Sequence, residues 1–199
     1  GIHNLISHCK IHDFLGSGIG ASGNYTIIEY CEVYNCCQNN NQDLGKSDSW
    51  GSGISTRRVE HGIFCNYSTI RHCTVHDIWG EGISTFEATH TTIEDNTVYD
   101  IYSVNLYVSD ATDCLVQRNF VYNTRDMGDG SQVGIGHWGE VQNPANARNT
   151  FINNIAYGCR RNFYTGGDLD NIMVANNTFV NSVSECNIVV AGLNTTSAN

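Results

Sequence analysis

Apolar residues recur along the chain at a fixed spacing. The segment STIRHCTVHDIWGEGIST (68–85) aligns without a gap on TTIEDNTVYDIYSVNLYV (91–108), at a shift of 23 residues. Within each segment, short runs alternate apolar and polar residues, which indicates short strands, and no 3.6-residue helical period runs through them. Self-similarity at a period of this length is the signature of a repeat architecture. The alternation therefore predicts a chain built from stacked strand repeats.

The same pattern occurs in seven copies. Each copy has an apolar residue, then Cys or Asn three positions later, and usually a second apolar residue five positions after the first. The copies begin at Ile6, Ile28, Ile70, Ile93, Val116, Phe151 and Val174, so the basic period is 22–23 residues. A repeat of this size cannot bury its apolar face alone, so the copies must stack, and three short strands per copy predict a parallel β-solenoid. Leucine-rich repeats have a similar period, but the helical half of such a repeat is missing from the pattern.

The repeat also assigns a direction to many side chains. Three inward stacks are predicted, the first formed by the residues that begin the copies. The second is Ile11, Val33, Val75, Val98, Val121, Ala156 and Phe179, and the third is Ile19, Ile54, Ile83, Leu106, Ile135 and Tyr164. A turn column between the first two stacks is Cys9, Cys31, Cys73, Asn96, Asn119, Asn154 and Asn177. Asn side chains stacked about 4.8 Å apart can hydrogen-bond along the axis, so an asparagine ladder is predicted in the second half of this column.

An outward column of rings is the other regular feature. It consists of His12, Tyr34, His76, Tyr99, Tyr122 and Tyr157. Ring pairs on neighbouring strands stabilise sheets, so we favour rings that stack on one another. The alternative is a row of flat faces on which sugar rings stack.

The register I-x-x-N-x-V-x-D, followed by a variable loop and Gly-Ile-Ser, resembles the right-handed parallel β-helix of the pectate-lyase-like superfamily. The likeness covers about residues 4–191. It implies an all-β, single-stranded right-handed parallel β-helix of about seven coils with three parallel sheets, forming a single domain over residues 1–199. Members of that superfamily include polysaccharide lyases, glycoside hydrolases, uronan epimerases, phage tailspikes and adhesins. The resemblance therefore implies an extracellular or cell-surface location and leaves the activity open.

Charge and cysteine content narrow the expected partners. Ten Lys and Arg residues against twenty Asp and Glu residues give a net charge of −10. This argues against nucleic acid, since phosphate binding needs a basic face, whereas a polysaccharide remains the expected partner. No apolar run approaches the length needed to span a bilayer. Nine cysteines leave at least one thiol unpaired, and free thiols acting as small apolar filler are favoured over disulfides, for example one from Cys36 or Cys37 to Cys65.

Two insertions in the repeat predict a groove. Segments 36–51 and 124–133 occupy the same connection of their respective copies. They should therefore project from one edge of the solenoid, three coils or about 14 Å apart, with one sheet as the floor between them. Functional residues concentrate on loops held by rigid scaffolds, and clefts are the usual binding sites. The resemblance also implies an active groove in this region.

The groove region contains candidates for two chemistries. A lyase needs a base and a cation that stabilises an enediolate, a role open to Arg57, Arg58, Lys46 or Arg125. A hydrolase needs two carboxyl groups, and the leading pair is Glu81 with Asp126 or Asp129.

Further candidates come from the same region. The Asp-Met-Gly-Asp-Gly run makes Asp126 and Asp129 the candidate calcium ligands as well, and calcium the one candidate cofactor. His137 in the run GIGHWGE is another candidate catalytic residue. Substrate contacts are expected from Trp138, Tyr107, Phe86, Trp50, Arg58 and Glu87.

A second hypothesis is a non-catalytic structural or adhesive β-helix, such as a fibre, filament or surface protein. The repeat is already running at residue 4, its last strand ends near residue 191, and no capping helix is evident at either end. Open solenoid ends expose backbone groups and core side chains. We therefore expect either a section of a longer protein or ends that associate with further copies.

Overall fold

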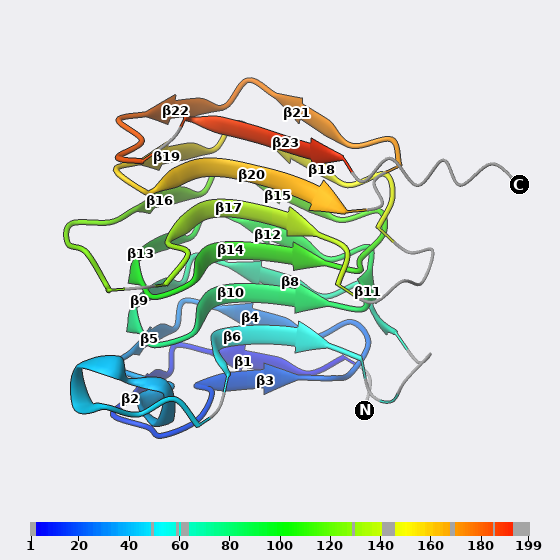
Figure 1. The fold of residues 1–199 in the computed structure, drawn as a ribbon. Helices are drawn as coiled ribbons and strands as arrows, with labels where there is room; N and C mark the ends of the chain where they lie inside the picture. Colours follow the sequence, from blue (N-terminus) through cyan, green and yellow to red (C-terminus); the bar gives the residue numbers. More distant parts are fainter. Residues whose placement is uncertain are drawn as a thin grey trace, which may run out of the picture.

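Strands of successive repeats lie one above another and pair in parallel, as a computed structural model shows (Figure 1). The structure describes residues 3–48, 50–58, 60, 64–128, 130–140, 146–167, 170–184 and 186–192. Within them the chain forms three seven-stranded sheets and one two-stranded sheet. The predicted all-β solenoid of about seven coils is therefore confirmed.

Each sheet takes one strand from every coil. The first sheet contains β1 (Leu5–Ser7), β4 (Ile27–Glu29), β8 (Thr69–Arg71), β12 (Thr92–Glu94), β15 (Leu115–Gln117), β18 (Thr150–Ile152) and β21 (Met173–Ala175). The second contains β2 (Lys10–His12), β5 (Glu32–Tyr34), β9 (Thr74–Ile78), β13 (Thr97–Ile101), β16 (Phe120–Tyr122), β19 (Ile155–Tyr157) and β22 (Thr178–Val180). The third contains β3 (Ile19–Ala21), β6 (Ser52–Arg57), β10 (Glu81–Phe86), β14 (Val104–Ser109), β17 (Val133–Trp138), β20 (Arg161–Gly167) and β23 (Ile188–Gly192). The small sheet pairs β7 (Cys65–Asn66) with β11 (Ala88–Thr89).

The strand register confirms the inward stacks, with one correction. Ile70 pairs with Ile28 and Ile93, and Val75 pairs with Val33 and Val98, all of them fully buried. In the third stack, however, Ile135 pairs with Phe163, and the prediction that Tyr164 points inward is wrong. Because successive side chains on a strand point to opposite faces, a shift of one residue places Tyr164 on the outer surface.

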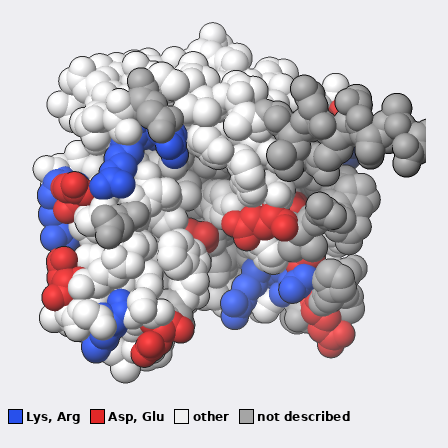
Figure 2. Space-filling view, viewed as in Figure 1, with Lys and Arg blue, Asp and Glu red and all other residues white. Residues whose placement is uncertain are grey.

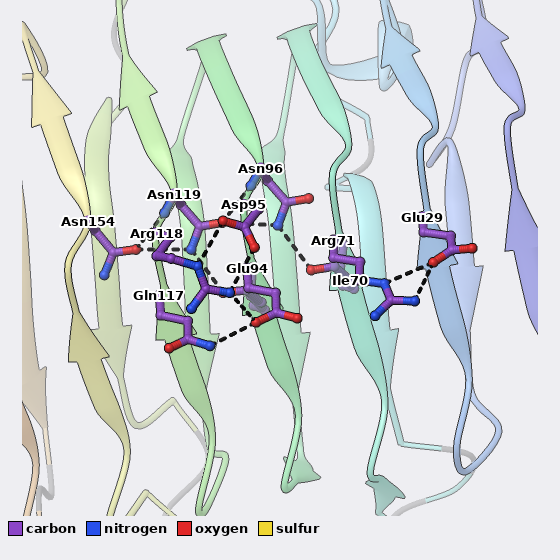
Figure 3. Close-up of polar contacts among 11 residues, drawn as sticks. Glu29, Ile70, Arg71, Glu94, Asp95, Asn96, Gln117, Arg118, Asn119 and Asn154 are labelled. Carbon is purple, nitrogen blue, oxygen red and sulfur yellow. Dashed lines mark hydrogen bonds and ion pairs between the residues drawn. The ribbon is translucent and has the colours of Figure 1, made fainter.

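The predicted asparagine ladder is present in the second half of the chain (Figure 3). The side-chain amide of Asn96 donates to Asn119 Oδ1 at 3.0 Å, and the amide of Asn119 donates to Asn154 Oδ1 at the same distance. Each of these oxygens also accepts the backbone N–H of the Asn one coil away. The ladder therefore satisfies buried backbone groups at a sharp turn, where a lost hydrogen bond would cost about 1–3 kcal/mol.

The outward aromatic column stacks on itself. Neighbouring rings from His12 through Tyr34, His76 and Tyr99 to Tyr122 lie 4.7–5.0 Å apart and nearly parallel. Each inner ring therefore has its two faces covered by its neighbours. The column stiffens the second sheet, and the alternative of free faces for sugar rings does not hold for these residues.

All nine cysteines are free thiols. Seven are buried, whereas Cys9 and Cys186 are exposed. Burial raises the pKa of Cys73, Cys114 and Cys159 to about 12, which keeps these thiols protonated and unreactive. The alternative of a disulfide from Cys36 or Cys37 to Cys65 is therefore not realised, and the thiols act as apolar filler.

The two insertions leave the solenoid on the same side, at the left edge of Figure 1. The first lies between β5 and β6 and contains two short 3₁₀ turns, η1 (Gln38–Asn40) and η2 (Gln42–Leu44). The second lies between β16 and β17. In the described part of the chain, no helix is both long enough and apolar enough to cross a membrane.

Candidate functional site

A cavity of about 320 Å³ lies on the outer face of the third sheet, beside the two insertions. It is lined by Trp50, Glu81, Ser103, Val104, Tyr107, Ser131, Val133, Gly136, Trp138, Glu140, Arg161 and Tyr164. These residues come from the two insertions and from β10, β14, β17, β20 and the positions next to these strands, so five successive coils contribute to one site. Figure 2 shows acidic side chains in the middle of this face, with basic side chains above and below them.

The floor of the cavity is shaped by a glycine between two tyrosines. The register places Tyr107, Gly136 and Tyr164 in one row across β14, β17 and β20. A Cβ at Gly136 would lie 2.8 Å from Val104 Cγ1 and 3.2 Å from Tyr107 Cδ2. The absence of that side chain leaves the hollow between the two phenol rings. Because strands are about 4.8 Å apart, the tyrosines are about 10 Å apart along the row.

An aromatic pair forms one wall of the cavity. The Trp138 and Tyr164 rings are stacked, with centroids 5.4 Å apart and an interplanar angle of 21°. Trp138 lies against Gly166, where a Cβ would come within 1.9 Å of its ring. Flat rings at the edge of a polar cavity suit the apolar faces of sugar rings.

Glu81 begins β10 and brings a carboxyl group to the cavity. The indole N–H of Trp50 donates to Glu81 Oε1 at 3.2 Å, and the Ser52 hydroxyl donates to Oε2 at 3.2 Å. Burial nevertheless raises the pKa of Glu81, and the nearby charge of Glu140 raises it further. The shift favours a protonated carboxyl group, which is the state needed in a general acid.

Glu140 supplies a second carboxyl group. The phenol of Tyr107 donates to Glu140 Oε1 at 2.5 Å, and the backbone N–H of Glu140 donates to Asp110 Oδ2 at 3.0 Å. Burial, followed by the hydrogen bond to Glu140, raises the pKa of Tyr107, so the phenol keeps its proton and remains the donor. Two contacts from the end of β14 therefore fix the position of Glu140.

A cation stands at the other end of the cavity. Arg161 lies on β20, in the register row of Val133, with its guanidinium 5.4 Å from the centroid of the Tyr164 ring. The preceding residue, Arg160, donates to the carbonyl oxygens of Gly128 and Gly130 at 2.7 and 3.0 Å and thereby holds the second insertion against β20. Arg161 thus lines the cavity, whereas Arg160 binds the second insertion.

The structure brings together four of the residues predicted from the sequence: Glu81, Trp50, Tyr107 and Trp138 all line the cavity. Asp126 does not line it. Its Oδ1 accepts hydrogen bonds from Gln132 Nε2 at 2.7 Å and from the backbone N–H of Gly128 at 3.0 Å, and these bonds lower its pKa. Asp126 therefore stabilises the second insertion through these local hydrogen bonds.

Of the two candidate calcium ligands, Asp126 is the one that the described residues include. Asp129 lies outside the described residues. Among the residues that are described, no group of three or more His, Cys, Asp or Glu side chains is arranged to hold a metal ion. The calcium prediction thus gains no support from a donor set.

Four other predicted residues lie near the carboxyl ends of β6 and β10, outside the cavity lining: Arg57, Arg58, Phe86 and Glu87. Arg58 forms an ion pair with the buried Glu87 and places its guanidinium 5.6 Å from the centroid of the Phe86 ring. Arg57 and Phe86 share a register row with Ser109 and Trp138. Phe86 is therefore about 10 Å from Trp138 along the sheet.

His137, a candidate catalytic residue from the sequence, does not line the cavity. Its side chain is fully buried, with its ring nitrogens 3.0 Å from Thr165 Oγ1 and 2.9 Å from Asn149 Nδ2. Burial lowers its pKa to about 4, so the ring is neutral at physiological pH. The neighbours Gly136 and Trp138 face outward, and the two-residue period of a strand then requires His137 to face inward.

Three residues that carry the chemistry of the cavity are not among the site residues predicted from the sequence. Tyr164 was assigned to the core, Arg161 was not among the predicted contacts, and Glu140 was absent from the predicted carboxyl pair. The register of β20 would have placed both Tyr164 and Arg161 outward, had Phe163 been aligned with Ile135. Arg125, a candidate lyase cation, lies elsewhere, because it pairs with Asp77 Oδ1 at 2.5 Å.

Comparison with known proteins agrees with this architecture. Residues 2–179 match the family described as right handed beta helix region, and the chain belongs to that family. A similar solved structure is the A-module of the mannuronan C-5 epimerase AlgE4 from Azotobacter vinelandii, with a TM-score of 0.58 and 12% sequence identity. The alignment covers 100% of this chain and 58% of the epimerase chain, so the likeness shows the fold. None of the curated protein sequences compared with the chain matches it.

Proposed function

We propose that the chain binds a polysaccharide in the cavity of the third sheet and hydrolyses it, with Glu81 and Glu140 as the reacting carboxyl groups. The observation that carries the proposal is the presence of both carboxyl groups in one cavity beside the Trp138–Tyr164 ring pair. The fold's likeness to an epimerase module that acts on mannuronan supports a carbohydrate ligand in general terms.

The two carboxyl groups have different surroundings, as a hydrolase requires. Burial raises the pKa of Glu81, which favours the protonated form that can donate its proton to the leaving glycosidic oxygen. Glu140 is held by the Tyr107 phenol and can act as the second carboxylate, which either activates water or attacks the sugar carbon. The pair differs from the one predicted from the sequence, because Glu140 takes the place of Asp126 or Asp129.

Proton abstraction from a uronate is the second candidate, because Arg161 lines the same cavity. A guanidinium can bind a carboxylate and stabilise the negative charge that develops next to it. In that reaction no water is consumed, and elimination leaves an unsaturated sugar that absorbs ultraviolet light.

One assay separates these functions. The protein is incubated with neutral, uronate-containing and amino-sugar polysaccharides while reducing ends and ultraviolet absorbance are followed. We expect reducing ends without absorbance, and expect Glu81→Gln and Glu140→Gln to abolish their release. Glu94→Gln, on the outer face of the first sheet, is the control that keeps activity. Release of both signals would instead establish the lyase, and loss of activity in Asp126→Asn would restore the carboxyl pair predicted from the sequence.

The non-catalytic alternative makes a different prediction in the same experiment. Saturable binding without either product would identify a carbohydrate-binding β-helix, and end-to-end polymers in electron micrographs would identify a structural one. Self-association and an extracellular location both remain predictions that depend on the sequence and the family resemblance.

A further inference from the structure

The first insertion places one hydrogen-bond donor, the indole N–H of Trp50, beside the Glu81 carboxyl group in the cavity. Trp50 lies at the end of this insertion, and its indole ring meets the Tyr102 ring edge-on at 5.9 Å. The insertion is itself fixed to the next two coils, because Asn40 Nδ2 donates to the carbonyl oxygen of Trp79 at 2.7 Å and Gln42 hydrogen-bonds the Tyr102 hydroxyl. The backbone N–H of Glu81 donates to the carbonyl of Gly51 at 2.9 Å. These contacts hold Trp50 in register with Glu81.

The two oxygens of the Glu81 carboxyl group therefore differ in kind. Oε1 faces the indole N–H of Trp50, which can donate and cannot accept. Oε2 faces the hydroxyl of Ser52, which can do either. In the neutral acid the proton must therefore reside on Oε2, because a proton on Oε1 would point at another donor.

The hydroxyl of Ser52 is also hydrogen-bonded to a second hydroxyl, that of Ser84. Ser52 Oγ and Ser84 Oγ are 2.8 Å apart, both residues are buried, and either atom can be the donor. When Glu81 is protonated, Oε2 donates to Ser52, which donates to Ser84. When Glu81 is ionised, Ser52 donates to Oε2 and accepts from Ser84. The pair can thus satisfy both protonation states by rotating two hydroxyl groups.

We propose that Trp50 and Ser52 are positioning residues for Glu81, which together place its proton on Oε2, while the Ser52–Ser84 pair reorients to match either protonation state of the carboxyl group. The role of Glu81 as an acid rests on the proposed function, whereas the location of its proton does not. Other titratable or charged groups near Glu81 are Glu140, Tyr107 and Arg161 in the cavity, and Cys37 in the first insertion. The test must keep all four of these unchanged.

The loss of either hydrogen-bond donor should raise the pKa of Glu81. Hydrogen bonds to an ionised oxygen are about twice as strong as bonds to a neutral one, so losing either donor destabilises the charged form more. Trp50→Phe and Ser52→Ala should therefore each raise the pKa of Glu81, by about 0.5–1 unit. Ser52→Thr keeps the hydroxyl and should return the midpoint to that of the wild-type protein.

The experiment is a pH titration followed by carbon-13 NMR of protein labelled at glutamate carboxyl groups. The Glu81 resonance is assigned as the signal missing from Glu81→Gln. The matched control is Ser55→Ala, which removes the hydroxyl in register with Ser84 on the neighbouring strand. Thermal unfolding of each variant establishes that it is folded, and the midpoint of Trp50→Phe alone decides the outcome if Ser52→Ala does not fold.

The expected result is a raised midpoint in Trp50→Phe and Ser52→Ala, with the Ser55→Ala and Ser52→Thr midpoints at the wild-type value. An unchanged or lowered midpoint in both Trp50→Phe and Ser52→Ala would overturn the proposal, as would an equal shift in Ser55→Ala. The titration needs no substrate, so a protein that cleaves no polysaccharide would still give a decisive answer here. Failure of the proposed function and failure of this inference are therefore separate outcomes.

Discussion

At the scale of single residues, position on the coil decides whether a polar side chain supports the fold or the site. Asn119 and Glu81 both lie at bends between strands, and both carry side chains that could serve either purpose. Asn119 is buried and gives all its hydrogen bonds to the chain above and below. Glu81 opens onto a cavity and is surrounded by neutral donors. The first is therefore expected to affect stability and the second activity.

The ladder prediction concerns Asn119→Ala. This change leaves the backbone N–H of Asn96 and the carbonyl of Ile93 without their side-chain partner. We expect it to lower the free energy of unfolding by about 1–3 kcal/mol, measured by urea titration. Gln117→Ala, on the outer surface two residues away, is the control and should change it by less than about 0.5 kcal/mol. Equal midpoints for the two variants would rule out the ladder as a source of stability.

The raised pKa of Glu81 predicts how both activity and stability depend on pH. Activity that needs a protonated Glu81 should fall as the pH rises through its raised pKa. The raised pKa also means that the folded protein binds a proton that the unfolded chain releases, so stability falls as the pH rises from about 4 through the folded pKa. Glu81→Gln removes this loss. Its melting temperature should match that of the wild-type protein at low pH and be no lower at neutral pH, while activity is abolished.

Two results with Glu81→Gln would contradict the role proposed for this residue. Full activity in Glu81→Gln would remove this residue from the site. A melting temperature that is lower than that of the wild-type protein at neutral pH would mean that the ionised carboxylate stabilises the fold, against the direction of its pKa shift.

At the scale of strands and loops, the sequence was sufficient for the register and insufficient for the cavity. Identical spacing of apolar residues in every copy fixes which strands pair, because each copy must bury the same face. The one error in the register, Tyr164 in place of Phe163 in the inward stack, arises because two adjacent aromatic residues both fit a large inward position. Glu140, by contrast, enters the cavity from beyond the end of β17, where the repeat no longer constrains the chain. The period therefore predicts the buried stacks, whereas the position of Glu140 depends on a connection that the repeat does not constrain.

The row that forms the cavity floor allows a test at this scale. Gly136→Ala adds a Cβ where Val104 and Tyr107 leave no space, so we expect oligosaccharide affinity to fall by about tenfold or more in calorimetric titration. Gly20→Ala lies at the same position of β3 in the third sheet, where a Cβ would meet only Ser55 Oγ at 3.9 Å. That control should keep the wild-type affinity. Equal loss in both variants would point to a general effect on the sheet.

At the scale of the whole molecule, the solenoid is held together by buried columns and not by covalent links. Apolar stacks, the asparagine ladder, stacked rings and thiols each run along the axis through several coils. Charged side chains on the first sheet continue the pattern outside, where Arg71 donates to Glu29 and Arg118 donates to Glu94 and Asp95 (Figure 3). The rigid stack of coils that results allows residues from five successive coils to form one cavity.

Thiol chemistry provides a test of this packing. Seven of the nine thiols are buried, so a reagent that reacts with thiolates should label Cys9 and Cys186 in the native protein. All nine should react after unfolding in denaturant, where the raised pKa values of Cys73 and its buried counterparts return to normal. Rapid labelling of Cys73 or Cys114 without denaturant would contradict the packed core described above.

The most direct test of the polysaccharide proposal is a crystal structure of Glu81→Gln soaked with an oligosaccharide from a cleaved or bound polymer. The account predicts a sugar ring over Gly136, between Tyr107 and Tyr164, with residue 81 and Glu140 on either side of the reacting bond. A cavity left empty at saturating ligand, with the sugar bound at another face of the solenoid, would contradict it.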